Sequence, residues 1–210
     1  IQRSRGLGDV YKRQVFKHPE AKHIWDAAEK EVARIEEHDI SWVAHSDPDF
    51  PLALNLCPDA PLVLFSSGQP FPNTTRVISI VSTKQPSADG KAFVRQLVES
   101  LAPYRPIIVS GFAYGIDIAA QLAAVENNLI TYGCLGHGIL NCSPNKHLKQ
   151  RKKIEAQGGF LTELWSHEQI QRAHFLQRNR IIAGLAQATI VVESKSCLLY
   201  TSDAADERSC

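Results

Sequence analysis

At residues 107–117 the chain has the sequence IIVSGFAYGID, an apolar run that passes through two glycines into an expected helix. Ile107–Val109 is apolar without interruption, as a strand buried on both faces requires. Glycine allows a sharp turn and a close approach of the backbone to a ligand. Beyond the turn, apolar residues recur at helical spacing as far as Glu126. A strand that turns directly into a helix is the first half of a βαβ unit, which builds parallel sheets.

The same alternation of strand and helix continues from residue 76 to the end of the apolar pattern. The expected strands are Val77–Val81, Ile107–Val109, Leu129–Leu135, Phe160–Glu163 and Thr189–Glu193. The expected helices cover about residues 88–102, 113–126, 145–157 and 175–185. Because the strands are continuous apolar runs, they indicate a mostly parallel sheet with helices on both faces. We therefore expect an α/β, Rossmann-like doubly wound domain at residues 76–196.

Residues 15–75 depart from this pattern and are expected to form a short irregular and helical lead-in. Residues 20–37 carry apolar side chains at helical spacing, which predicts one helix. Ser41–Ala44 is a candidate strand, and another apolar run lies at Leu62–Phe65 among several prolines.

Both ends look foreign to the domain. The chain contains no methionine, and residues 9–14 and 197–202 can be encoded by complementary strands of one DNA sequence. We interpret residues 1–14 and 197–210 as translated sequencing adapter and exclude them from the fold. We also expect the chain to be a fragment that stops inside its last domain.

Composition and charge limit the classes of function. The chain is 44% hydrophobic and 21% charged, and it lacks the run of about 20 apolar residues that spans a bilayer. We expect a soluble cytoplasmic protein without a membrane association. Its net charge of +1 includes +3 from residues 1–14 and −2 from residues 197–210, so the remainder is neutral. A nucleic-acid partner therefore has to be argued from local clusters of charge. Metal ligands and cofactors are not expected, because the cysteines lack zinc-binding spacing.

The turn that ends the strand at Ile107–Val109 is the first candidate site. The N–H groups of a helix's first turn point outward without partners, and such a helix end binds phosphate well. The candidate residues in this turn are Ser110, Gly111, Ala113 and Gly115. The alternative is a structural turn that has no ligand.

A second candidate segment, Gly136-His137-Gly138, follows the next strand. Parallel strands place their carboxyl ends at one edge of the sheet, so Gly136 and Gly138 should lie beside the first turn. A basic segment from Lys146 to Lys153 comes next, and its lysines can share one helix face. It is either part of the site or an ordinary solvated surface.

Arg178 and Arg180 flank an asparagine in an otherwise apolar helix. Buried charges are costly unless they find partners. Each arginine could bind a phosphate through its planar guanidinium, or pair with Glu163 or Glu193. Both interpretations can hold, one for each arginine.

No catalytic motif is evident. The sequence has no GxxxxGK[ST] loop, no GxSxG elbow and no HExxH motif, so we do not expect an enzyme. Asp117 and Glu163 are the only well-placed acids, and Asp117 can simply favour the positive end of a helix dipole. An alternative is a Rossmann-like enzyme for a nucleotide or phosphoribosyl substrate, with one of these acids as the acid or base. A dinucleotide sensor is a third possibility, although a clean GxGxxG is missing.

Together these segments resemble the DprA/Smf family of bacterial DNA-processing proteins. The resemblance covers about residues 47–193. It rests on DPDFP at 47–51, SGFAYGID at 110–117, GHG at 136–138 with Pro144, GGFLTE at 158–163 and RNRIIAGL at 178–185. The motifs follow the family's order and spacing, which is more specific than any one motif.

The resemblance implies binding of single-stranded DNA in a basic pocket above the sheet. It also implies a homodimer that delivers this DNA to a RecA-type recombinase in natural transformation. It assigns DNA contacts to Lys84, where the family has arginine, and to Lys146, and it places Gly111 and Gly115 in the phosphate turn. The chain departs from the family at Ser82, at Gln121 and at residues 141–143, where a tyrosine able to stack is absent.

Overall fold

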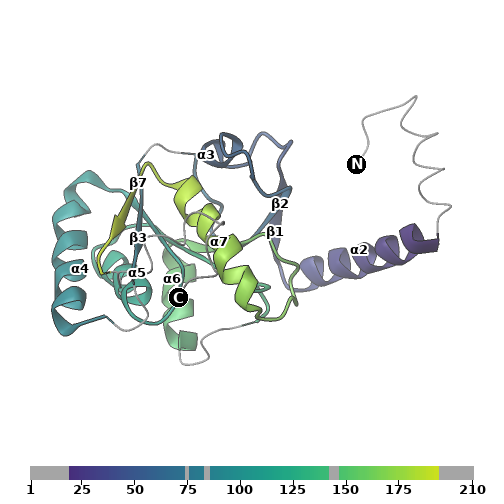
Figure 1. The fold of residues 1–210 in the computed structure, drawn as a ribbon. Helices are drawn as coiled ribbons and strands as arrows, with labels where there is room; N and C mark the ends of the chain where they lie inside the picture. The colour runs from purple at the N-terminus through teal and green to yellow at the C-terminus, as the bar shows by residue number, and fades with distance from the viewer. Residues whose placement is uncertain (1–18, 74–75, 83–85, 142–146, 194–210) are drawn as a thin grey trace, which may run out of the picture. The chain divides into compact units, whose positions relative to one another are not determined.

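The structure is a computed structural model that describes residues 19–73, 76–82, 86–141 and 147–193. The chain divides into two compact units, residues 1–40 and residues 41–210. The described part of the first unit contains the helix α2 (Pro19–Glu37), which confirms the helix expected at residues 20–37. The second unit carries the alternating strands and helices (Figure 1).

The described part of the second unit is built on one seven-stranded sheet with the order β1-β2-β6-β5-β4-β3-β7. Its strands are β1 (Ser41–Ala44), β2 (Val63–Gly68), β3 (Val77–Val81), β4 (Ile107–Ser110), β5 (Thr131–Cys134), β6 (Gly159–Thr162) and β7 (Ala188–Val191). All pairings among β3 to β7 are parallel. β2 pairs antiparallel with β6, and β1 pairs antiparallel with β2. The expected α/β fold with a mostly parallel sheet is confirmed.

The sheet extends further toward the N-terminus than we expected. β1 and β2 come from the segment that we interpreted as an irregular lead-in, and they add two strands to the sheet. β2 pairs with a strand almost a hundred residues away, with Phe65 opposite Thr162. The strand preference of so short a run depends on such distant neighbours, which local sequence does not reveal. A short helix, α3 (Leu52–Asn55), lies between β1 and β2 in the chain.

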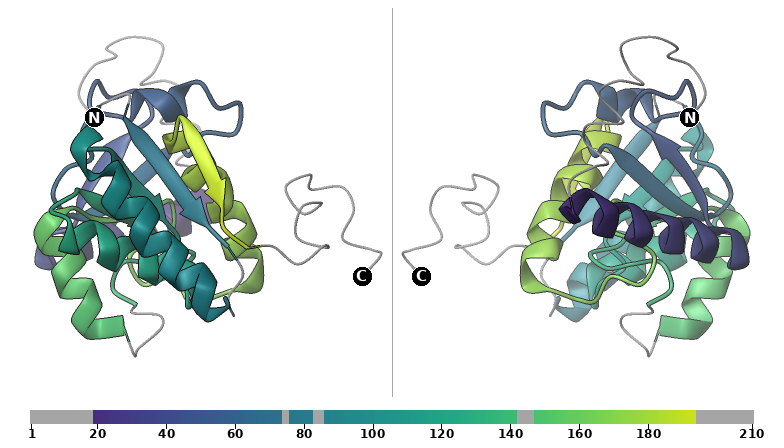
Figure 2. Two further views of the ribbon diagram at one scale, coloured as in Figure 1. Left: turned by 90° about the vertical axis from the view of Figure 1, so that its left-hand side faces the viewer. Right: turned by 90° about the vertical axis from the view of Figure 1, so that its right-hand side faces the viewer.

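Helices cover both faces of this sheet (Figure 2). On one face, α4 (Ala88–Leu101) and α5 (Ile116–Glu126) enclose a core that includes Val94, Ile108 and Ala120. On the other face, α3 and α7 (Arg172–Leu185) contribute to a core that includes Leu54, Val109 and Ile182. The successive residues Ile108 and Val109 of β4 thus lie in different cores. This arrangement is the doubly wound fold, and it explains why the strands are apolar throughout.

The connections that follow β5 and β6 leave the sheet toward opposite faces. After β5 comes α6 (Leu148–Gln157), in which the Arg151 guanidinium lies 5.2 Å from the centre of the Phe160 ring. After β6 comes α7, which packs in the core that contains Leu161. Since successive residues of a strand point to opposite faces, α6 and α7 lie on opposite sides of β6. In open α/β folds, ligands bind at the carboxyl edge of the sheet, where neighbouring connections diverge in this way.

Candidate nucleic-acid interface

The turn between β4 and α5 is held in an unusual backbone conformation. The helix begins at Ile116, three residues later than we expected, so the segment Gly111–Gly115 stays outside it. Gly115 is the N-cap residue with φ 96°, a region that favours glycine. Phe112 also has a positive φ, 56°, and its buried ring lies edge-on to Phe160 at 4.8 Å. The turn is therefore fixed to the core by an aromatic contact.

A buried pair of opposite charges lies beneath this turn. Nη1 of Arg178 donates hydrogen bonds to the carbonyl oxygens of Gly111 and Cys134, each at 2.6 Å. The carboxylate oxygen Oδ2 of Asp117 accepts a hydrogen bond of 3.3 Å from the Ala113 N–H. Both side chains are buried. The pair ties the turn to the ends of β4 and β5, the two central strands of the edge.

Burial dominates the electrostatics of this pair. It raises the pKa of Asp117, although the charge on Arg178 and hydrogen bonds from the turn oppose this rise. It lowers the pKa of Arg178, and here the negative charge on Asp117 is the main opposing influence. Burial also raises the pKa of the neighbouring Cys134 thiol to about 12, which keeps that thiol protonated. The geometry thus makes Arg178 a support of the turn, because its guanidinium faces protein groups.

Ser110 faces the interior as well, whereas the second half of the turn faces solvent. The Ser110 hydroxyl donates a 2.6 Å hydrogen bond to the Ile80 carbonyl and so joins β4 to β3. Ala113 and Gly115 are partly exposed, and Tyr114 between them is exposed. A ligand can therefore approach the turn from the side of residues 113–115.

Gly136 and Gly138 follow β5 at the same edge, as we expected. The Gly138 N–H donates a 2.9 Å hydrogen bond to the Glu168 carbonyl, which joins this loop to the loop after β6. A Cβ atom on Gly138 would overlap the backbone carbonyl of Trp165. On Gly136 it would lie 3.2 Å from the Phe175 ring, which is tight but tolerable. Gly138 is thus required for packing, and Gly136 is less restricted.

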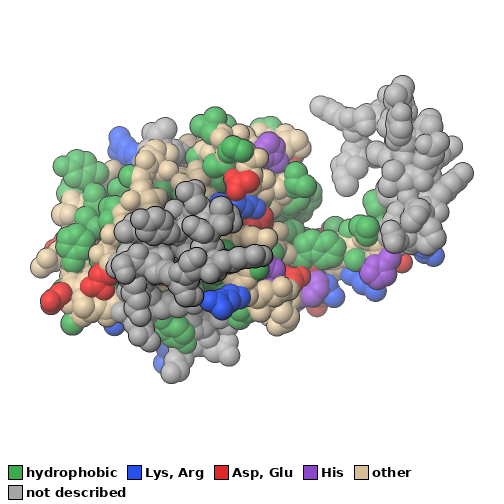
Figure 3. All heavy atoms as spheres, in the orientation of Figure 1, with side chains coloured by type: hydrophobic (Ala, Val, Ile, Leu, Met, Phe, Trp, Pro, Cys, Tyr) green, Lys and Arg blue, Asp and Glu red, His purple; other side chains and the backbone are tan. Residues whose placement is uncertain are grey.

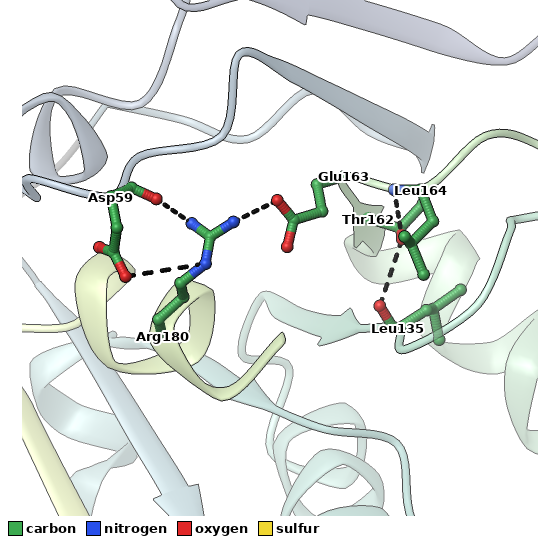
Figure 4. A network of polar contacts seen from close by, with 6 residues as sticks. All are labelled: Asp59, Leu135, Thr162, Glu163, Leu164 and Arg180. Carbon is green, nitrogen blue, oxygen red and sulfur yellow. Dashed lines mark hydrogen bonds and ion pairs between the residues drawn. The ribbon is translucent and has the colours of Figure 1, made fainter. Parts of the chain in front are cut away.

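Arg180 belongs to a separate ion network at the end of β6 (Figure 4). Its Nη2 pairs with Glu163 Oε2, its Nη1 donates to the Asp59 carbonyl, and its Nε lies 3.8 Å from Asp59 Oδ2. The Thr162 hydroxyl beside it donates a 3.2 Å hydrogen bond to the Leu135 carbonyl. Of our two interpretations of the arginines, pairing with Glu163 therefore fits Arg180.

We expect Arg180→Ala to lower the free energy of unfolding by about 1 kcal/mol, because the ion pair is partly exposed to water. The side chain of Arg180 is 27% exposed to solvent in the structure. Urea unfolding followed by circular dichroism measures the change. Glu163→Gln keeps an acceptor for the guanidinium and should cost less. A loss as large as that expected for a fully buried ion pair would contradict the partial exposure of this network.

Lys84 and Lys146, the two lysines predicted to contact DNA, lie outside the described residues. The residues next to them are described. The Ser82 hydroxyl donates a 2.6 Å hydrogen bond to the Glu193 carbonyl, which joins the ends of β3 and β7. His147 precedes α6 as its N-cap residue. The positions of the two lysines therefore stay predictions.

Sequence reasoning missed two features of this edge. The Glu193 carboxylate accepts hydrogen bonds from the Ser87 hydroxyl and, at 2.9 Å, from the Ser87 N–H, and these bonds lower the pKa of Glu193. It thereby fills the N-terminus of α4, where an anionic ligand could otherwise bind. We also grouped His147 with the basic residues, but it is buried between Phe112 and Tyr114, and burial lowers its pKa. Both features depend on contacts between distant segments, which no local pattern indicates.

Comparison with known proteins identifies the family. The family model described as DNA recombination-mediator protein A matches residues 41–209. The chain belongs to this family. The DNA processing protein DprA of Bacillus subtilis is 30% identical to it over 177 residues, which are 84% of this chain and 60% of that protein. The protein Smf of Synechocystis is 32% identical over 82% of this chain and 46% of that protein. The chain thus spans about half the length of these DprA and Smf relatives.

Solved DprA structures have the same fold. The X-ray structure of DprA from Streptococcus pneumoniae matches 92% of this chain and 69% of its own chain, with a TM-score of 0.75 and 28% identity. A structure of DprA from Helicobacter pylori, described for its single-stranded DNA binding mode, matches 78% and 72% with a TM-score of 0.68 and 26% identity. The resemblance drawn from the motifs is confirmed. Among the residues that the structure describes, no helix is long and apolar enough to cross a membrane.

Proposed function

We propose that the protein binds single-stranded DNA at the carboxyl edge of its sheet and acts in DNA recombination during natural transformation. The observation that carries this proposal is the fixed turn Gly111–Gly115, which lies at the edge where α6 and α7 diverge. Exposed amides at such a turn bind the oxygens of a phosphate without reading the base. Membership of the DprA family and the single-stranded DNA binding described for the H. pylori relative support the same function.

In this proposal each candidate residue has a defined part. Lys84 and Lys146 supply positive charge to the phosphates, and the partly exposed Gly115 supplies backbone. Gly111 and Ala113 shape the turn, because their N–H groups are hydrogen-bonded to Asp117. The other candidates support the phosphate-binding turn and the neighbouring loops from within the protein: Ser110, Gly136, Gly138, Arg178 and Arg180. Acidic and basic side chains are interspersed on the visible face of the second unit (Figure 3), so a few local cations have to provide the attraction.

The arrangement of the acids favours a binding protein over the alternative enzyme. A general acid or base has to reach the proton that it transfers. Asp117 is buried next to Arg178, and Glu163 is paired with Arg180. In the described part of the chain, neither carboxylate is therefore free to transfer a proton at the carboxyl edge of the sheet. We further propose a cytoplasmic location, a homodimer and a RecA-type recombinase as the partner that receives the DNA, all on the strength of family membership.

A salt titration tests the proposed function. We expect the affinity for single-stranded DNA to fall as salt rises, with a log–log slope of about −0.7 for each phosphate contacted. Lys146→Glu should weaken binding to all sequences alike and make the slope shallower. Arg105→Glu is a matched control, because Arg105 is exposed just before β4, at the opposite edge of the sheet. A flat salt response, or equal losses in the two variants, would contradict the proposal.

A further inference from the structure

We propose that Tyr114 is a stacking platform for one unpaired base of the bound strand. This inference rests on the proposed function and adds to it a contact with a nucleobase, where the turn itself contacts only phosphate. It is carried by the exposure of one ring and by the way in which three further rings hold it.

Tyr114 is the residue through which the phosphate turn presents an aromatic surface to solvent. Its side chain lies between Ala113 and Gly115 and is 46% exposed, whereas Phe112, two residues earlier, is 2% exposed. A nucleotide whose phosphate lies on the amides of this turn carries its base within reach of the adjacent side chain.

A ladder of edge-to-face ring contacts anchors Tyr114 in the core. The Tyr114 ring lies 4.9 Å from His147 at an interplanar angle of 64°. His147 lies 5.4 Å from Phe112, and Phe112 lies 4.8 Å from Phe160 in β6. Edge-to-face pairs are favourable arrangements of aromatic rings. These contacts fix the orientation of the Tyr114 ring before any ligand binds, so little conformational entropy is lost on stacking.

The chemistry of the ladder favours a base over a phosphate. Burial lowers the pKa of His147, and the backbone hydrogen bond at Phe112 offsets this only in part. The histidine beside Tyr114 therefore takes up a proton less readily than an ordinary histidine. Every nucleobase has a π-face, and stacking on a protein aromatic needs no particular sequence. An unpaired base can stack on the rigid, uncharged ring of Tyr114 while the phosphate of the same nucleotide lies on the turn.

Abasic DNA separates stacking from phosphate binding. We expect Tyr114→Ala to weaken binding to oligodeoxythymidine by about tenfold, within the range for loss of one base–aromatic stack. The same change should leave binding to an abasic oligonucleotide of equal length unaltered, because that strand offers phosphates alone. Tyr114→Phe keeps the ring and should retain the affinity. The salt slope should be the same in all three proteins, since no cation is removed.

Tyr104→Ala is the matched control. Tyr104 is 68% exposed in the short 3-10 helix Ala102–Tyr104, which precedes β4 and so lies at the edge opposite to Tyr114. Its removal should leave binding of both strands unchanged. Equal losses on the normal and abasic strands in Tyr114→Ala, or no loss on either, would overturn the stacking role. Failure of the unmodified protein to bind either strand would instead overturn the proposed function, so the two failures are distinguishable.

Discussion

Replacing Arg178 by alanine should lower the free energy of unfolding by about 3–5 kcal/mol, the range for removing one of two interacting buried charges. The change leaves the buried carboxylate of Asp117 without its cation. It also removes the donor that satisfies the carbonyl oxygens of Gly111 and Cys134 at 2.6 Å. Urea unfolding of the variant and the unmodified protein, followed by circular dichroism, measures this loss.

Arg172→Ala is the control for that measurement. Arg172 begins α7, the helix that carries Arg178, but its side chain is exposed. A substitution of an exposed residue away from any buried charge or core contact usually changes the free energy of unfolding by less than about 0.5 kcal/mol. Similar losses in the two variants would show that a cation on α7 matters only through the helix and not through the buried pair.

The pH dependence of Arg178→Ala is a second test of the pair. Burial raises the pKa of Asp117 above its ordinary value of 3.8, and in the variant Arg178 no longer opposes this rise. Between the ordinary and the raised pKa, the folded state binds a proton that the unfolded state has lost. Stability therefore decreases as pH rises through this interval. The deficit of the variant should be smallest below pH 3.8, where Asp117 is neutral in both states, and a deficit independent of pH would contradict the pairing.

The position of the candidate site could be predicted from sequence because parallel strands share a carboxyl edge. Val109 and Leu135 end apolar runs, so the glycines that follow them had to lie near one another. The pairing of Asp117 with Arg178 could not be predicted in the same way. It depends on how α7 packs across the sheet, and local spacing says only that the charge is costly if it stays alone. Sequence reasoning therefore considered Asp117 for a helix dipole or as an acid, and Arg178 for phosphate or for pairing with Glu163 or Glu193, and did not connect the two residues.

The aromatic ladder shows a similar limit. Histidine next to lysines in sequence suggests a cationic segment, and His147 was grouped with its neighbours on that basis. In the structure its ring lies between Phe112 and Tyr114, two residues that are about 35 positions earlier in the chain. Burial then determines its charge, because a low-dielectric environment disfavours the protonated ring. Its role follows from tertiary contacts that a single sequence does not encode in any short pattern.

Gly111→Ala should weaken single-stranded DNA binding by about tenfold or more, which corresponds to at least ~1.4 kcal/mol, and should also destabilise the fold. A Cβ atom at this position would lie 2.5 Å from Oδ2 of Asp117 and still closer to Nη1 of Arg178. The guanidinium cannot withdraw without losing its bonds to two carbonyls, so the turn itself has to move. Overpacking of this kind costs about 1–3 kcal/mol. DNA titration and urea unfolding of the variant measure the two effects.

Gly136→Ala is the control for Gly111→Ala. It shows whether the loss comes from overlap with Asp117 and Arg178 or from a general intolerance of side chains at this edge of the sheet. Its Cβ would lie 3.2 Å from an edge atom of the Phe175 ring, so a shift of a few tenths of an ångström relieves the contact. We expect it to retain most of its stability and binding. If Arg178 is the obstacle for Gly111→Ala, the double variant Gly111→Ala/Arg178→Ala should lose less stability than the sum of the single changes, because neighbouring residues that share an interaction are not additive. Strict additivity would show that the turn and the buried pair act independently, and Arg178 could then no longer be the residue that holds the phosphate turn in place.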